Sequence, residues 1–148
     1  MMIENSEYGI NKYPVDKYPE QELTRKIIGI CMEVHRQLGH GFLEVVYQEA
    51  LSHELSLKGV TFEREKRYTI AYREIILSHF YVADFVIEGR LILELKAQSG
   101  IVDEHYKQVI NYLAASKNEC GLIINFGEPS LKFKRVILTT KNNLRKSA

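Results

Sequence analysis

Two apolar runs separated by a short polar segment constrain the fold of this chain more than any other feature. FYVADFVI (80–87) and LILELKA (91–97) have the length of strands, and Glu88-Gly89-Arg90 lies between them. Apolar runs joined by a few residues that include glycine are typical of antiparallel hairpins. A three-residue loop would pair Ile87 with Leu91, whereas a two-residue loop would shift the pairing by one position.

Two helical patterns precede this hairpin. From Gln21 to Leu38 the apolar residues recur at intervals of three and four, which predicts a helix with one buried face. Gly39-His40-Gly41 then ends the helix, because glycine allows a sharp turn. A second helix is predicted from Leu43 to Lys58, with Gly59 at its C-terminal cap.

The remaining segments complete an α/β pattern. Residues 61–72 alternate between apolar and polar types, as in an edge strand, and a helix is predicted over 102–116. GLIINF (121–126) and residues 133–138 are predicted strands. A strand, helix and strand in this order usually form a right-handed crossover between parallel strands. The expected order is α-α-β-β-β-α-β-β, with helices flanking a mixed sheet.

Composition places this fold in one domain. The 148 residues are 45% hydrophobic and 26% charged, with a formal net charge of +1, which excludes a strongly basic nucleic-acid coat. We expect an N-terminal arm (1–20), a domain (21–140) and a basic C-terminal tail (141–148). Cys31 and Cys120 lack zinc-ligand spacing, and no segment resembles a signal peptide or a membrane span. A reduced, cytoplasmic protein is therefore expected.

Charged residues interrupt both strands of the hairpin. Side chains alternate along a strand, so Glu94 and Lys96 point to the same face of 91–97. With the three-residue loop, Asp84 lies directly opposite Glu94 on that face, whereas a two-residue loop would place it opposite Leu93. Burying an unpaired ion costs roughly several kcal/mol. Glu94 and Lys96 therefore need either a salt bridge to each other or a metal and a substrate.

Two close carboxylates with a neighbouring ammonium group suit phosphodiester hydrolysis. The carboxylates of Asp84 and Glu94 would repel each other unless a cation or a proton intervened, and oxygen ligands suit Mg²⁺ or Mn²⁺. Such a metal activates water, while Lys96 would hold that water or offset negative charge in the transition state. Acyl transfer is less suited, because no Ser or Cys has the setting of a nucleophile.

These residues also resemble a known family. Asp84, nine intervening residues and Glu94-Leu95-Lys96 resemble the core motif of the PD-(D/E)XK nuclease superfamily. Gly41, Glu44 and Tyr47 match the signature of the GxxExxY proteins, a bacterial branch of it. The flanking segments EVHRQLG, ADFVI and GLIINFG are also similar to that branch, as is the 105–112 pattern His-x-x-Gln-x-x-x-Tyr. The resemblance covers roughly residues 22–138, and His40 departs from it where proline is expected.

The resemblance implies a restriction-endonuclease-like fold and a metal-dependent nuclease acting on nucleic acid, with DNA preferred over RNA. It implies that Asp84 and Glu94 hold Mg²⁺ or Mn²⁺, that Glu44 supplies a further carboxylate, that Lys96 assists the water and that Gln108 lies beside the site. Tyr47 is interpreted as a structural neighbour of Glu44. A homodimer or another partner is expected, because the domain is small for enclosing a duplex.

Plainer interpretations remain open. His105 could contact a phosphate, although a partly exposed helical histidine is the commoner case. A basic stretch near the C-terminus could follow a nucleic-acid backbone, although such runs are more often simply solvated. It comprises Lys132, Lys134, Arg135, Lys141, Arg145 and Lys146. The alternatives to an enzyme are a catalytically silent nuclease-fold module that acts with a partner, and a structural cluster in which Lys96 pairs directly with Glu94 or Asp84.

Overall fold

The computed structural model describes residues 19–138, which form three helices and five strands. In chain order these are α1 (Gln21–Leu38), α2 (Glu44–Leu57), β1 (Phe62–Tyr72), β2 (Ile75–Ile87), β3 (Leu91–Lys96), α3 (Asp103–Ser116), β4 (Cys120–Asn125) and β5 (Lys132–Ile137). The order is the one expected from the sequence. The basic tail and almost all of the N-terminal arm lie outside the described residues.

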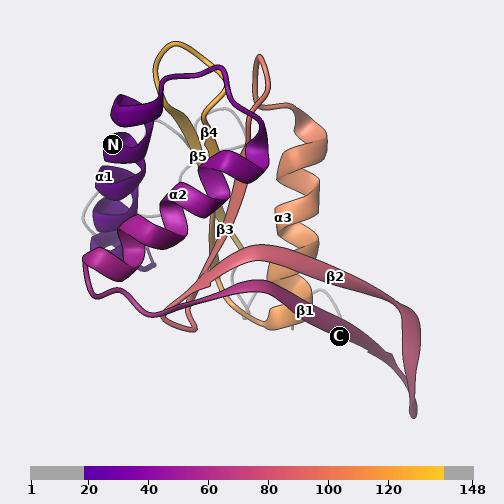
Figure 1. Cartoon of the computed structure of the whole chain (residues 1–148). Helices are drawn as coiled ribbons and strands as arrows, with labels where there is room; N and C mark the ends of the chain where they lie inside the picture. The colour runs from indigo at the N-terminus through magenta and orange to yellow at the C-terminus, as the bar shows by residue number, and fades with distance from the viewer. Residues whose placement is uncertain (1–18, 139–148) are drawn as a thin grey trace.

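The strands form one mixed sheet in the order β1-β2-β3-β4-β5. Only β3 and β4 are parallel, and α3 makes the crossover between them. The other neighbours are antiparallel. In Figure 1, α1 and α2 cover one face of the sheet and α3 covers the other. The three-layer arrangement leaves β4 buried along its whole length.

Side-chain alternation divides the core between the two faces. Leu91, Leu93 and Leu95 of β3 pack with residues of α1 and α2, whereas Ile92 packs with residues of α3. Glu94 and Lys96 share the parity of Ile92, so the charged positions of β3 lie on the face that α3 covers. The segment LILELK is therefore a central strand with two charged residues on one side.

Glycines end both N-terminal helices where the sequence predicts it. Gly39 follows α1 with a φ of 76°, and Gly59 follows α2 with a φ of 71°. Both angles lie in the left-handed region that glycine adopts without steric cost. None of the described helices is both long and apolar enough to cross a membrane.

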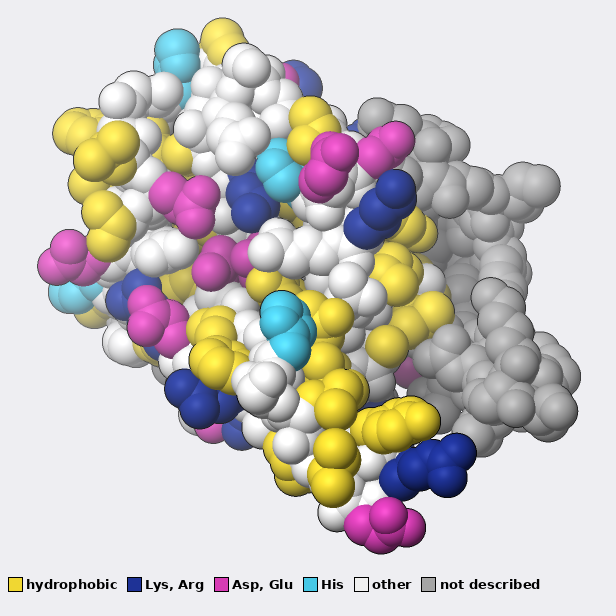
Figure 2. Space-filling model, turned by 90° about the vertical axis from the view of Figure 1, so that its right-hand side faces the viewer, with side chains coloured by type: hydrophobic (Ala, Val, Ile, Leu, Met, Phe, Trp, Pro, Cys, Tyr) yellow, Lys and Arg dark blue, Asp and Glu magenta, His cyan; other side chains and the backbone are white. Residues whose placement is uncertain are grey.

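The hairpin formed by β1 and β2 is longer than the sequence predicts. β2 begins at Ile75 rather than at residue 80, because a tight turn at Arg73-Glu74 pairs Ile75 with Tyr72. The outer part, residues 68–82, projects away from the rest of the sheet as a hairpin arm (Figure 1). Apolar side chains gather on it in Figure 2. The residues at the start of β2 are exposed on both faces, so their sequence lacks the alternation of apolar and polar residues that predicts a half-buried strand.

Candidate functional site

The β2–β3 hairpin has the three-residue loop. Ile87 pairs with Leu91, and Phe85 pairs with Leu93, so the register predicted from the sequence is confirmed. Glu88 and Gly89 in the loop have positive φ angles of 52° and 69°. Continuing the same register places Asp84 opposite Glu94, where the backbone pairing of the two strands ends.

Side chains replace the backbone hydrogen bonds at this point. The Leu95 N–H donates to Asp84 Oδ2 at 2.9 Å, and the Asp84 N–H donates to Glu94 Oε1 at 3.3 Å. Each carboxylate thus reaches across to the backbone of the opposite strand. The exchange fixes both side chains at the place where β2 and β3 separate.

Both carboxylates are held in an environment that disfavours their charge. Glu94 is only 3% exposed, and its pKa is raised well above the usual value by burial and then by the negative charge of Asp84. Burial also raises the pKa of Asp84, although the Leu95 N–H and the charge of Lys96 oppose this effect. Two neighbouring carboxylates that resist ionisation form a site that a cation would stabilise.

Lys96 bonds to the helix rather than to the carboxylates. Its Nζ donates to Gln108 Oε1 of α3 at 3.3 Å. No ion pair links Lys96 to Asp84 or Glu94 among the residues that the structure describes. The direct salt bridge that a purely structural cluster would require is therefore not formed. Gln108 lies beside Lys96, as the resemblance implies.

Glu44 belongs to α2, which lies on the face of the sheet opposite α3 (Figure 1). It is the first residue of α2 and is half-buried. Burial raises its pKa, and the charge of Asp84 raises it further, while Lys96 opposes the shift. Gln48 Nε2 donates to Glu44 Oε2 at 3.4 Å. The charge of Asp84 thus acts on Glu44, and the charge of Glu44 raises the pKa of Glu94, although the hydrogen bond of Glu44 is to its own helix.

Tyr47 secures the loop that precedes Glu44. Its hydroxyl donates to the Gly39 carbonyl at 2.6 Å and accepts the Phe42 N–H at 3.2 Å. The buried ring stacks on Phe126 with centroids 4.6 Å apart. This agrees with the structural role expected for Tyr47. The side chain of His40, which departs from the family pattern, is exposed and leaves the Tyr47 contacts intact.

His105 and Arg135 are both more deeply buried than the sequence predicts. His105 is only 8% exposed, and its Nδ1 accepts the Val102 N–H at 3.2 Å at the start of α3, so it caps a helix rather than meeting solvent. Arg135 is 2% exposed on β5, so it cannot contribute to a basic surface track. The other members of that stretch near the C-terminus, Lys141, Arg145 and Lys146, lie outside the described residues.

The carboxylate oxygens of Asp84 and Glu94 are of the kind that binds a divalent metal, but Glu44 does not lie close enough to form a three-ligand cluster with them. Asp84 and Glu94 are adjacent oxygen donors whose charges are poorly compensated, which suits a hard cation such as Mg²⁺. Within residues 19–138, however, no three His, Cys, Asp or Glu side chains lie close enough to form a metal site. The expectation that Glu44, Asp84 and Glu94 stand together is therefore not met in this conformation.

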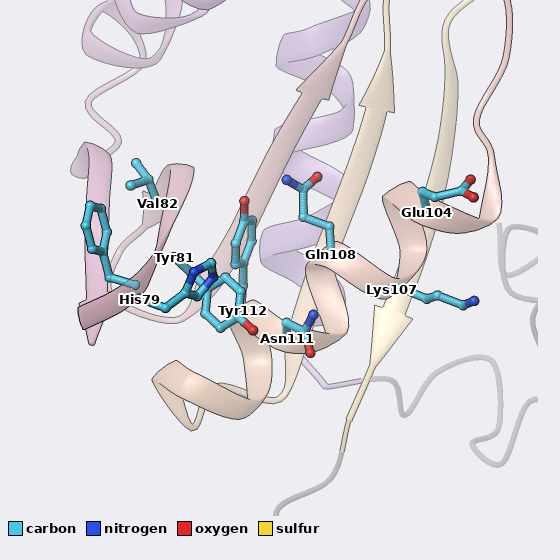
Figure 3. A pocket seen from close by; sticks show the side chains of 9 residues that line it. His79, Tyr81, Val82, Glu104, Lys107, Gln108, Asn111 and Tyr112 are labelled. Carbon is cyan, nitrogen blue, oxygen red and sulfur yellow. The ribbon is translucent and has the colours of Figure 1, made fainter. Parts of the chain in front are cut away.

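A cavity of about 470 Å³ beside the site was not anticipated from the sequence. Figure 3 shows it between β2 and α3. The side chains that line it are His79, Phe80, Tyr81, Val82, Glu104, Lys107, Gln108, Asn111 and Tyr112. The i, i+4 spacing of Gln108 and Tyr112 signals the helical wall. Residues 80–82 fall in the strand predicted over 80–87, but nothing in the sequence marks them, or His79, as part of a cavity wall.

Loops at the carboxyl ends of β3 and β4 are also tied together. Asn125 Oδ1 accepts the Gln98 N–H at 3.0 Å and the Gly127 N–H at 3.1 Å, while Asn125 Nδ2 donates to the Gln98 carbonyl at 2.9 Å. Because Asn125 is paired with Lys96 in the sheet, this network supports the end of the strand that carries the site. In the sequence, this network is indicated only by an asparagine at the end of a predicted buried strand.

A family model relates this chain to known proteins. The solved structure described as "Crystal structure of SSO0001" is similar with a TM-score of 0.46 and 15% identity, over 86% of this chain and 83% of that one. No curated protein matches. A family model described as the PD-(D/E)XK nuclease superfamily matches residues 21–136, which is most of the chain and includes every residue of the candidate site. The chain therefore belongs to the PD-(D/E)XK nuclease superfamily.

Proposed function

We propose that this protein is a metal-dependent nuclease that hydrolyses phosphodiester bonds in nucleic acid, with DNA as the preferred substrate, and that it represents the GxxExxY branch of its superfamily. The observation that carries the proposal is the cross-strand exchange between Asp84 and Glu94 beside a lysine that donates its hydrogen bond to Gln108 instead. Burial makes the two ionised carboxylates costly without a cation, and within residues 19–138 Lys96 forms no direct ion pair with either of them.

Asp84 and Glu94 would hold Mg²⁺ or Mn²⁺, because carboxylate oxygens are the ligands these ions prefer. When bound, the metal would polarise the phosphate and lower the pKa of a water molecule. Glu44 would supply a further carboxylate to the metal or to its waters. The charge of Asp84 acts on Glu44 and that of Glu44 acts on Glu94, so an approach of the start of α2 would complete the set.

Lys96 would act on the phosphate rather than on the metal ligands. An ammonium group beside the reacting phosphate offsets the charge that develops in the transition state and can hold the attacking water. Gln108 would position Lys96, because its Oε1 accepts the Nζ hydrogen bond at 3.3 Å without adding charge. Side-chain alternation keeps Lys96 on the same face as Glu94.

A substrate panel tests this proposal. Linear, circular and single-stranded DNA and RNA are incubated with purified protein in Mg²⁺, in Mn²⁺ or in EDTA. Cleavage of at least one substrate that requires metal and is lost in Asp84→Asn is expected. The proposal fails for these substrates if nothing is cleaved, or if Asp84→Asn cleaves as fast as the unmodified protein.

A second candidate has a specific observation in its favour. Asp84 Oδ2 and Glu94 Oε1 already accept backbone N–H groups, and the three expected metal ligands are not gathered. These features would suit a catalytically silent nuclease-fold module that binds nucleic acid and acts with a partner. Retention of nucleic-acid binding without cleavage of any substrate in the panel would favour this candidate.

A further inference from the structure

The cavity between β2 and α3 shares Gln108 with the candidate catalytic residues. Gln108 accepts the Lys96 hydrogen bond and also lines the cavity. Tyr112 lines the same cavity; burial raises the pKa of its hydroxyl, and the charges of Glu94 and Asp84 raise it further. In Figure 3, Gln108 and Tyr112 stand on the side of α3 that faces β2. A ligand that contacts Gln108 would therefore lie one hydrogen bond away from Lys96 of the candidate site.

The lining combines aromatic rings with amide groups. Tyr81 meets Tyr112 edge to face with centroids 5.5 Å apart, and His79 meets Tyr81 in the same way at 5.2 Å. Neither pair is stacked in parallel, so a flat ligand can still find a ring face. Gln108 and Asn111 provide hydrogen-bond donors and acceptors for the edge of such a ligand. Flat faces with polar edges are the chemistry of a nucleobase.

The charge of the lining argues against recognition through phosphates alone. Lys107 and Glu104 are the two charged residues that line the cavity, and their charges cancel. The whole chain carries a formal net charge of only +1, so a long basic track cannot supply the affinity. Stacking and hydrogen bonds to a base would therefore supply most of the binding here.

A base in a continuous duplex cannot use these walls. Its faces are covered by its neighbours and only its edges are accessible in the grooves, so an aromatic wall requires an unstacked nucleotide. The cavity is open to solvent, and its volume of about 470 Å³ lies within the range of small-ligand sites, which includes a single nucleotide.

We propose that the cavity between β2 and α3 binds an unstacked base of single-stranded nucleic acid, next to the phosphate positioned at the Asp84–Glu94 centre. The substrate class is thus nucleic acid with unpaired nucleotides beside the cleaved bond, such as single strands, overhangs or flaps. This inference rests on the proposed function for the position of the phosphate, but base binding itself does not require cleavage.

Binding is measured by fluorescence anisotropy with the full chain in EDTA, so that the proposed hydrolysis does not run. The probes are a labelled oligodeoxythymidylate dodecamer, an abasic dodecamer with the same phosphates, and a blunt duplex that contains the thymidylate strand. The single strand is expected to bind about tenfold more tightly than either other probe, in line with the usual contribution of base stacking.

Substitutions of residues that line the cavity test whether the cavity causes the preference for the single strand. Tyr81→Ala should bind all three probes equally, whereas Tyr81→Phe keeps the ring and should retain the preference. Tyr72→Ala removes a matched tyrosine from the hairpin arm outside the cavity and should also retain it. If Tyr81→Ala loses its cooperative thermal melt, His79→Ala, an exposed position, carries the same test.

The inference is overturned if the unmodified protein binds the thymidylate and abasic strands equally, or if a folded Tyr81→Ala or His79→Ala variant keeps the preference. These outcomes are independent of catalysis. Base-dependent binding without cleavage in Mg²⁺ would refute the proposed function alone, and cleavage without base-dependent binding would refute the cavity assignment alone.

Discussion

Asp84 and Glu94 each accept a hydrogen bond from the backbone of the other's strand, at the position where the β2–β3 pairing stops. The exchange holds the two carboxylates together although burial raises the pKa of both and the charge of Asp84 raises that of Glu94 further. Burial of the two ionised carboxylates is unfavourable for the stability of the metal-free fold, which is a common feature of functional sites.

Replacing Glu94 should therefore stabilise the metal-free protein, and more so at high pH. Because the pKa of Glu94 is raised on folding, the folded state holds its proton more tightly, and the wild-type protein loses stability as the pH rises from about 4.5 through the folded pKa. Glu94→Gln should raise Tm by about 2–8 °C at pH 8, since about 1 kcal/mol shifts Tm by that amount. The gain should shrink at pH 5.

Thermal melts in EDTA at both pH values measure this effect. Glu49→Gln removes a carboxylate from the exposed face of α2 and serves as the control, with an equal change at both pH values. A lower Tm for Glu94→Gln at pH 8 would show that Glu94 acts as an ordinary stabilising partner in the folded protein.

Divalent metal should stabilise the unmodified protein. A ligand that binds only the folded state at a hundred times its Kd adds about 2.7 kcal/mol to the free energy of unfolding. Mn²⁺ or Mg²⁺ should raise Tm in the unmodified protein and in Lys26→Ala, which lies on the exposed face of α1. It should have no effect on Asp84→Asn. An equal rise in Asp84→Asn would place the metal elsewhere.

Tyr47→Phe should loosen the loop before Glu44 without disturbing the core. The variant keeps the ring that stacks on Phe126 but loses the hydroxyl that bonds to Gly39 and Phe42. Two partly buried hydrogen bonds correspond to about 1–3 kcal/mol in unfolding free energy. Urea denaturation measures this loss, and Tyr72→Phe on the hairpin arm is the control. A loss no larger than that of the control would contradict the role assigned to the hydroxyl.

Gly127→Ala should destabilise the fold strongly, because the added Cβ would overlap the backbone of Gln98. Relief would require the loops after β3 and β4 to separate and would break the Asn125 network. Overpacking of this kind costs about 3 kcal/mol. Gly29→Ala, within α1, has open space around the added Cβ and should be neutral or stabilising. Equal stability of the two variants in urea would contradict the close approach.

The sequence predicted the framework because its signals were local. The three residues of the β2–β3 loop set the register, and the register places Asp84 opposite Glu94. The sequence could not show that the strands separate there, since that depends on side chains replacing backbone partners. It also missed His79 and Tyr81, because an exposed hairpin arm needs no hydrophobic alternation. The burial of His105 likewise depends on packing rather than on helical position.

The rate of metal-dependent cleavage by Lys96→Ala tests the central claim most directly. On whichever substrate the unmodified protein cleaves, loss of the ammonium group should reduce the rate roughly 10²-fold to 10⁴-fold, the range typical of a group that acts in the transition state. Lys26→Ala should cleave at the unmodified rate, and thermal melts should show both variants folded. A folded Lys96→Ala that cleaves as fast as Lys26→Ala would contradict the claim that Asp84, Glu94 and Lys96 form the catalytic centre.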